Sequence, residues 1–137
     1  MKLRILQLLS KMLNKGRAFQ KYTGSTSVTS GGSVSFSIGI TSHGAPIFIA
    51  ATCCWNGNTN GAWASMYISR DGTVLSQTTM VSTTASHNCP GSIVYMDYVP
   101  AGSYTYTCTL LSGSGDGTFS ENNSGRSEAP ALCAFEL

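Results

Sequence analysis

Apolar and hydroxyl side chains alternate along much of the chain, and this pattern limits the fold more than any other feature. From Ser33 onward, Val34, Phe36, Ile38 and Ile40 alternate with small polar residues. Residues 103–110 repeat the pattern with tyrosine, cysteine and leucine at every second position. Because successive side chains of a strand point to opposite sheet faces, each segment predicts a strand with one buried face.

The sequence predicts further strands between segments typical of turns, and no helical pattern occurs among them. Arg70-Asp71-Gly72 predicts a tight hairpin turn in which Gly72 takes a positive φ. The strand at 93–99 is expected to pair directly with the strand at 103–110, across Pro100-Ala101-Gly102. Such short, evenly spaced strands predict an all-β fold, an antiparallel jelly-roll-like sandwich. The remaining expected strands are 46–55, 64–69, 73–78, 118–120 and 129–137.

The N-terminal residues follow a different period. Leucines recur every three or four positions over residues 2–15, which predicts a short amphipathic helix ended by Gly16. We expect a basic amphipathic anchoring helix at 1–22, a Gly/Ser/Thr linker or loose first strand at 23–32, and the β jelly-roll domain at 33–137. The anchoring contacts are assigned to Leu3, Leu6, Leu9, Leu13, Lys2, Arg4 and Lys11.

A helix of this length needs a partner for its apolar stripe. Copies of itself in a three-stranded bundle, other proteins of a larger particle, or its own β domain could each supply that partner. Lys11 interrupts the apolar run, so a signal peptide is disfavoured, and no stretch approaches the roughly 20 apolar residues of a spanning helix.

Charge is scarce and unevenly placed. Charged residues make up 10% of the chain, against about 25% in ordinary soluble proteins. Six of the eight basic residues fall within the first 21 positions, and no acidic residue precedes Asp71. Such a segment could meet phosphates, an anionic membrane surface or acidic protein. Because it lacks residues that read bases, no specific nucleic-acid partner is expected.

The five cysteines do not form a recognisable framework. Their number is odd, Cys53 and Cys54 are adjacent, and no spacing matches a zinc site. We interpret Cys89, Cys108 and Cys133 as small strand hydrophobes, although a single disulfide stays open. No metal site is predicted.

Candidate catalytic groups each have a plainer explanation. His43 and His87 are the only histidines and lie in polar, turn-like segments, while Asp71 and Asp116 belong to turns. Asp97 is unusual because it lies within a strand, where a cross-strand pair or a subunit interface explains it. No nucleophile, base and carboxylate form a triad pattern. We therefore predict no enzyme activity, no catalytic residue and no cofactor.

One loop carries aromatic and amide side chains together. Trp55 and Trp63 flank a polar segment containing Asn56, Asn58 and Asn60. Aromatic rings and amides are what sugar-binding loops use, so these five residues are a candidate ligand loop. Burial of both tryptophans in a core or an interface is the alternative.

Three segments carry a family resemblance. They are Asp97 to Tyr106 with its V-P-A-G-S-Y-T-Y run, Gly115 to Phe119, and Ala131 to Leu137. In their order, over residues 33–137, the chain resembles the jelly-roll domains of phage fibre and minor structural proteins. The layout is also similar to the trimeric tumour-necrosis-factor-like superfamily.

This resemblance implies a homotrimer with Tyr104, Tyr106 and Phe135 at its interface. It also implies a structural virion protein of a tailed bacteriophage, made in the host cytoplasm and bound to capsid or tail proteins. Because no long shaft is present, a head fibre, decoration protein or short spike is expected rather than a free-standing tail fibre. The alternative is a receptor-binding tip for a host glycan or surface protein, and a weaker one is a secreted lectin-like protein.

Overall fold

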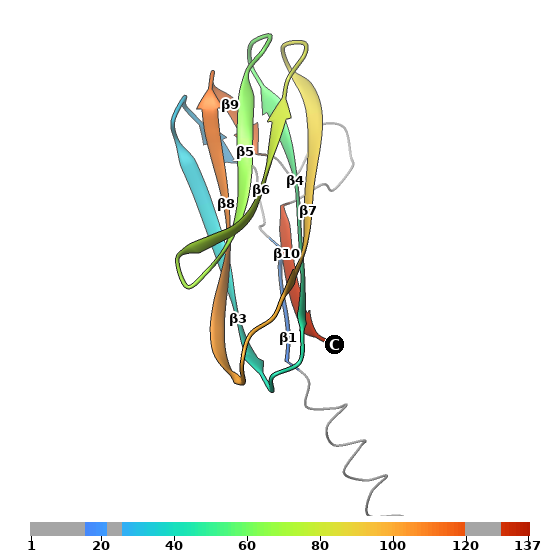
Figure 1. The fold of residues 1–137 in the computed structure, drawn as a ribbon. Coiled ribbons are helices and arrows are strands. Elements are labelled where there is room, and N and C mark those ends of the chain that lie inside the picture. Colours follow the sequence, from blue (N-terminus) through green and yellow to red (C-terminus); the bar gives the residue numbers. More distant parts are fainter. Residues whose placement is uncertain (1–15, 22–25, 120–129) are drawn as a thin grey trace, which may run out of the picture.

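The computed structural model describes residues 16–21, 26–119 and 130–137, and within these ranges the chain forms ten β-strands (Figure 1). The helix predicted for residues 2–15 lies outside the described residues. The strands are β1 (Arg17–Lys21), β2 (Thr26–Val28), β3 (Ser33–Ser42), β4 (Ile47–Gly57), β5 (Trp63–Arg70), β6 (Thr73–Val81), β7 (His87–Asp97), β8 (Gly102–Ser114), β9 (Gly117–Phe119) and β10 (Ala131–Glu136).

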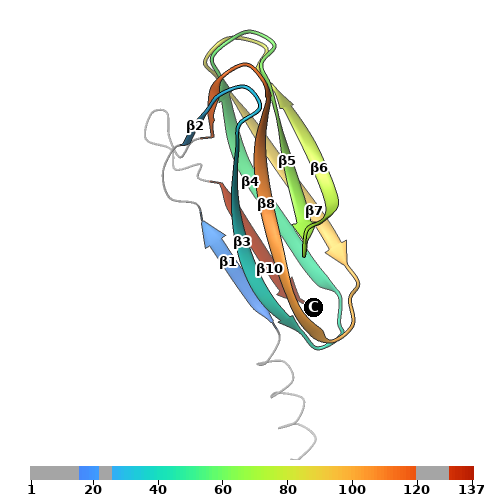
Figure 2. The same ribbon diagram turned by 90° about the vertical axis from the view of Figure 1, so that its left-hand side faces the viewer.

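Two antiparallel sheets pack face to face. The first has the order β3-β8-β5-β6. The second has six strands, in which β4 pairs with β10 and β9 on one side and with β7 on the other. β1 extends this sheet beyond β10, and β2 extends it beyond β9 (Figure 2). The predicted all-β sandwich is confirmed.

The alternating pattern places the core as predicted. Phe36, Ile38 and Ile40 of β3 are buried, whereas Ser37 and Gly39 between them are exposed. Tyr106 and Leu110 of β8 are also fully buried and lie on the same inner face. The hydrophobic residues of the two inner faces together form one continuous core.

The predicted hairpin turn joins β5 to β6. Arg70 lies opposite Thr73, so only Asp71 and Gly72 form the loop, with φ values of 46° and 87°. Two successive positive φ values match the primed turns that suit the twist of a hairpin. The backbone N–H of Asp71 donates to the carbonyl oxygen of Thr105, and its carboxylate accepts from the Thr105 N–H. The prediction for Gly72 is confirmed.

The predicted pairing of residues 93–99 with 103–110 is wrong. β7 pairs with β4 in the six-stranded sheet, while β8 pairs with β3 and β5 in the other. The connection from Tyr98 to Ala101 carries the chain from one sheet to the other. Alternation shows which side chains face the core, but both sheets of a sandwich face the same core.

The β domain also begins before Ser33. β1 pairs with β10 along residues 17–21, inside the range assigned to the anchoring helix. β2 pairs with β9 inside the range assigned to the linker, in agreement with the loose first strand considered for that segment. Both segments are short and polar, so their sequences carry little periodicity. In the described ranges, no helix has the length and hydrophobicity needed to cross a membrane.

Candidate interaction face

The six-stranded sheet has apolar side chains on its outer surface as well as its inner one. One row of outward-facing residues crosses β10, β4 and β7 and consists of Phe135, Phe48 and Met96. Two residues farther along the strands, a second outward-facing row consists of Cys133, Ala50 and Val94. We call these six residues the apolar face. Val94 is 66% exposed and Phe135 38%, and the Phe48 and Phe135 rings lie 4.9 Å apart.

A shallow hollow lies beside this face, along β1 and β10. Arg17 and Ala18 line it from β1, and Cys133 and Phe135 line it from β10. Arg17 is exposed and lies opposite Phe135 on β10, so it places a cation at the rim of this hollow. Exposed apolar surface of this kind in a soluble protein commonly marks a contact with another molecule.

The outer surface of the other sheet is chemically different. Ser35 and Thr109 pair through their hydroxyls at 2.9 Å, and Ser37 and Thr107 at 2.8 Å. We call these four residues the hydroxyl face. Exposed hydroxyl groups are well hydrated, so the hydroxyl face is stable in contact with water. The apolar face, in contrast, is stabilised when another surface covers it.

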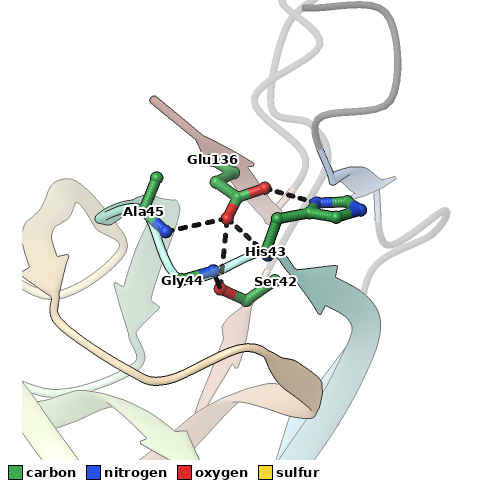
Figure 3. A network of polar contacts seen from close by, with 5 residues as sticks. All are labelled: Ser42, His43, Gly44, Ala45 and Glu136. Atoms are coloured by element: carbon green, nitrogen blue, oxygen red, sulfur yellow. Dashed lines mark hydrogen bonds and ion pairs between the residues drawn. The ribbon is translucent and has the colours of Figure 1, made fainter. Parts of the chain in front are cut away.

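The acidic residue next to Phe135 points away from the apolar face. Glu136 accepts hydrogen bonds from the Ser42 hydroxyl (3.2 Å), the backbone N–H groups of His43 (2.6 Å) and Ala45 (3.0 Å), and His43 Nδ1 (2.8 Å) (Figure 3). Its side chain is 1% exposed, against 57% for that of His43. The network joins the end of β10 to the turn between β3 and β4.

Hydrogen bonding decides the charge state of this carboxyl. Burial by itself would raise the pKa of Glu136, but the bonds from His43, Ala45 and Ser42 outweigh it and lower the pKa from 4.5 to about 2. An ionised carboxylate only accepts hydrogen bonds, so Nδ1 of His43 carries a proton. The far ring nitrogen points away from Glu136 (Figure 3).

A second buried carboxylate links the two sheets. Asp97, at the end of β7, accepts from Arg70 Nη1 at 2.6 and 2.7 Å and from the Tyr106 hydroxyl at 2.7 Å. Burial, followed by the hydrogen bond to Asp97, raises the pKa of Tyr106 above its usual range. Asp97 is thus paired within its own chain, but its partner Arg70 belongs to the other sheet and not to a neighbouring strand as the predicted cross-strand pair would require.

Of the three predicted trimer contacts, only Phe135 lies on the apolar face, and its part in a trimer stays a prediction. Tyr106 is fully buried in the core of its own chain and bonded to Asp97, so its assignment to a subunit interface is wrong. Tyr104 lies opposite Ile40 on the same inner side, and its hydroxyl donates to the Pro100 carbonyl. The alternation predicted along β8 is present, but the two tyrosine rings face the core of their own chain and not another subunit.

The other members of the apolar face were missed. Their signal is in β4, where Ile47, Phe48, Ile49, Ala50 and Ala51 are consecutive apolar residues. A strand that faces water on one side alternates, whereas an unbroken apolar run is typical of a strand covered on both sides. The dense run therefore indicates a second apolar surface as well as a buried strand.

The candidate ligand loop does not form one surface. Trp55 is fully buried with its ring 4.8 Å from that of Phe119. Asn56 donates to Ser86 and Asn88, and Asn60 accepts from the backbone of Ala85. These two amides hold the neighbouring loop in place.

Two loop residues remain accessible. Asn58 is exposed, and Trp63 is 37% exposed on the outer side of β5. The Trp63 ring lies against Gly113 and leaves no room for a Cβ there. Burial, the alternative considered for the tryptophans, is confirmed for Trp55 and holds only in part for Trp63.

Other predicted groups are placed as follows. All five cysteines are free thiols, and burial raises the pKa of Cys108 to about 12. Across the described ranges, no three histidine, cysteine or acidic side chains converge in a metal-like cluster. The anchoring residues Leu3, Leu6, Leu9, Leu13, Lys2, Arg4 and Lys11 lie outside the described residues.

Comparison with solved structures defines the fold class. The chain superposes on the structure of Eiger TNF from S. frugiperda with a TM-score of 0.55 and 11% identity, covering 90% of this chain and 91% of that one. It also superposes on dimeric latent PorU from Porphyromonas gingivalis with a TM-score of 0.58 and 7% identity, covering 89% of this chain but only 13% of PorU.

The fold is thus an all-β sandwich similar to a tumour-necrosis-factor-like jelly roll. At these identities the likeness concerns the fold alone. No protein-family profile matches the sequence, and no curated protein is significantly similar to it.

Proposed function

We propose that the chain is a structural protein of a tailed-bacteriophage particle that assembles as a homotrimer and has no enzymatic role. The observation that carries the proposal is the apolar face, where Val94 and Phe135 are exposed on a sheet with little charge. A TNF-like sandwich that buries this face between three copies would leave the hydroxyl face toward solvent. Residues 1–15 would then dock the trimer on a capsid or tail as a head fibre, decoration protein or short spike.

The assembly step is tested by light scattering on the full chain. We expect a mass three times the 14.4 kDa of the single chain. Val94→Lys places a charge in the apolar face and should give a smaller species, because burying an unpaired charge is strongly unfavourable. Ser35→Lys is the control, since Ser35 is exposed on the hydroxyl face of the other sheet. A wild-type monomer, or equal masses for both variants, would refute the trimer.

The particle step needs a separate experiment. Phage particles whose genome encodes the chain would be purified through a density gradient and their proteins quantified by mass spectrometry. A stoichiometric amount, in multiples of three copies, would support a structural role. Absence from intact particles would rule it out even if the isolated protein is a trimer.

A receptor-binding tip is the second candidate, favoured by the exposure of Asn58 and of Trp63. Binding of the full chain to a glycan array and to host cells would be compared with that of Trp63→Ala. Retained binding by that variant would exclude this loop, and no binding by the wild type would exclude the candidate.

A further inference from the structure

Trp63 lies on the outer surface of the four-stranded sheet, where the backbone of β8 provides a seat for its ring. In the pairing of β5 with β8, Trp63 lies opposite Ser114. The next residue, Ala64, lies opposite Ser112, so Gly113 is the extra residue of a β-bulge. Three consecutive atoms of the six-membered ring lie almost equally close to the position that a Cβ would take at Gly113. The indole therefore rests with one face on the glycine and is 37% exposed.

This arrangement fixes the ring in position before any ligand binds. Bulges re-aim side chains, and a glycine within a strand often marks the close approach of another group. A ligand that stacks on a ring already held in place does not bear the cost of ordering it. Trp55, the other tryptophan, is fully buried. Trp63 is therefore the tryptophan that a ligand can reach.

The strands around this ring carry almost no charge. Arg70 is the single charged residue in β3, β5, β6 and β8, and its guanidinium bonds to Asp97 of the other sheet. An ionic ligand would find no free partner of opposite sign along these strands. The surface therefore suits an uncharged ligand.

Hydroxyl and amide groups continue along the same surface. Two residues beyond Trp63, the hydroxyls of Ser65 and Thr79 lie 3.4 Å apart. In the next outward row, half-buried Tyr67 of β5 lies opposite exposed Gln77 of β6. Trp63 and Tyr67 are four residues apart on one face of a strand, so about 13 Å separates them. A ligand that contacts both aromatic rings must be a chain of several units.

We propose that this surface, from Trp63 to Tyr67, binds an uncharged polysaccharide. A pyranose ring has an apolar face of C–H groups and a rim of hydroxyls. Its face can stack on the exposed indole, and its hydroxyls can bond to serine, threonine and glutamine side chains, which both donate and accept hydrogen bonds. The inference is independent of the proposed trimer, which uses the other sheet, and it does not involve the loop at Asn58.

The neighbours of the ring favour a polysaccharide over a protein. Protein interfaces concentrate their binding energy in well-packed pockets from which water is excluded. On β6, Val81 lies opposite Trp63 and is 50% exposed, but the next outward residues are Thr79 and Gln77, whose side chains remain hydrated. A ligand with many hydroxyls can replace this water with equivalent hydrogen bonds.

Affinity electrophoresis of the full chain in native gels tests the inference. The probes are three soluble uncharged polysaccharides, a β-glucan, a mannan and a xyloglucan, together with the anionic polymer alginate. We expect at least one uncharged polymer to retard the wild type and alginate to leave its mobility unchanged. Trp63→Ala should raise the dissociation constant at least about tenfold, as expected for the loss of a stacking contact. Tyr67→Ala should raise it by about threefold.

Two glycine substitutions on the same sheet form a matched pair. Gly113→Ala places a methyl group where the ring lies, so it should displace the indole and weaken binding although no group that contacts the ligand is removed. Gly39→Ala, in β3, meets no atom within 4 Å and should leave binding unchanged. Acrylamide quenching reports on the ring itself. Bound polysaccharide should protect Trp63 from the quencher, whereas the emission of buried Trp55 shows that each variant is folded.

Asn58→Ala separates this surface from the neighbouring loop and should bind as the wild type does. The inference is overturned if no uncharged polysaccharide retards the wild type, or if folded Trp63→Ala is retarded equally. It is also overturned if Asn58→Ala abolishes binding and Tyr67→Ala does not, because the ligand then lies on the loop. A wild type that is a monomer and is still retarded would refute the trimer and leave the polysaccharide surface standing.

Discussion

At the scale of single residues, the two acidic side chains that end β7 and β10 determine how the strand ends are held. Asp97 accepts hydrogen bonds from Arg70 and Tyr106 of the other sheet, and Glu136 accepts hydrogen bonds from the turn that follows β3. Both carboxylates are buried and hydrogen-bonded. A buried charge is tolerable when its hydrogen bonds are made and destabilising when they are lost.

Asp97→Asn tests the link between the sheets. The amide retains one acceptor oxygen but loses the charge opposite Arg70, whose side chain is 28% exposed. We expect the free energy of unfolding to fall by about 2 kcal/mol in urea denaturation. Asp116→Asn, at an exposed site, should change it by less than about 0.5 kcal/mol. If both substitutions lower the free energy of unfolding equally, the buried pair of Asp97 and Arg70 stabilises the chain no more than an exposed carboxylate does.

Glu136 predicts a specific loss of stability in acid. Its pKa is near 2 in the folded chain and near 4.5 when free, so the unfolded chain binds more protons between these values. Stability contributed by the carboxylate is therefore complete above about pH 5 and declines as the pH falls toward 2. Urea midpoints measured across this window should drop less steeply for Glu136→Gln. If the urea midpoints of the wild type and of Glu136→Gln fall equally with pH, the lowered pKa of Glu136 is contradicted.

At the scale of elements, local sequence accounts well for strands and turns. The inner face of β3 and the Asp71-Gly72 turn are where the sequence predicts them, because period and turn chemistry are local properties. The pairing of β7 with β4 depends on contacts far apart along the chain, and alternation does not encode it. The strand that contains Tyr106 is predicted correctly because its alternation is a local property. Whether its ring faces the core or another subunit depends on distant contacts, and the interface assignment is therefore wrong. β1 escapes prediction because its five residues carry no pattern.

The turn itself offers a matched pair of glycine substitutions. Gly72 has a φ of 87°, whereas Gly39 lies in β3, is exposed and has no atoms within 4 Å of an added Cβ. Gly72→Ala should destabilise the chain by about 1 kcal/mol, since alanine strains at positive φ. Gly39→Ala should be neutral or slightly stabilising. Thermal unfolding of both variants compares the two backbones directly, and equal melting temperatures would refute the argument.

At the scale of the whole molecule, the sandwich has two unlike outer surfaces, one apolar and one of hydroxyls. β1 flanks the apolar one and pairs only with β10 in the described structure. The position of β1 decides where the folded unit begins.

Two shortened chains test that boundary. A chain beginning at Gly16 keeps β1 and should retain the melting temperature and the oligomeric mass of the full chain. A chain beginning at Ser33 lacks β1 and β2, exposes the edge of β10 and should melt at a lower temperature. If the chain from Gly16 is a monomer while the full chain is a trimer, the N-terminal segment drives assembly instead of the apolar face.

The place of β10 between β1 and β4 also bears on biosynthesis. β1 is made first among the described strands and β10 last, so β1 has no docking site while the ribosome is still translating the strands between them. Contacts between such distant segments slow folding. Until β10 emerges, β4 exposes an unpaired apolar edge, and a nascent chain in this state is expected to be prone to aggregation.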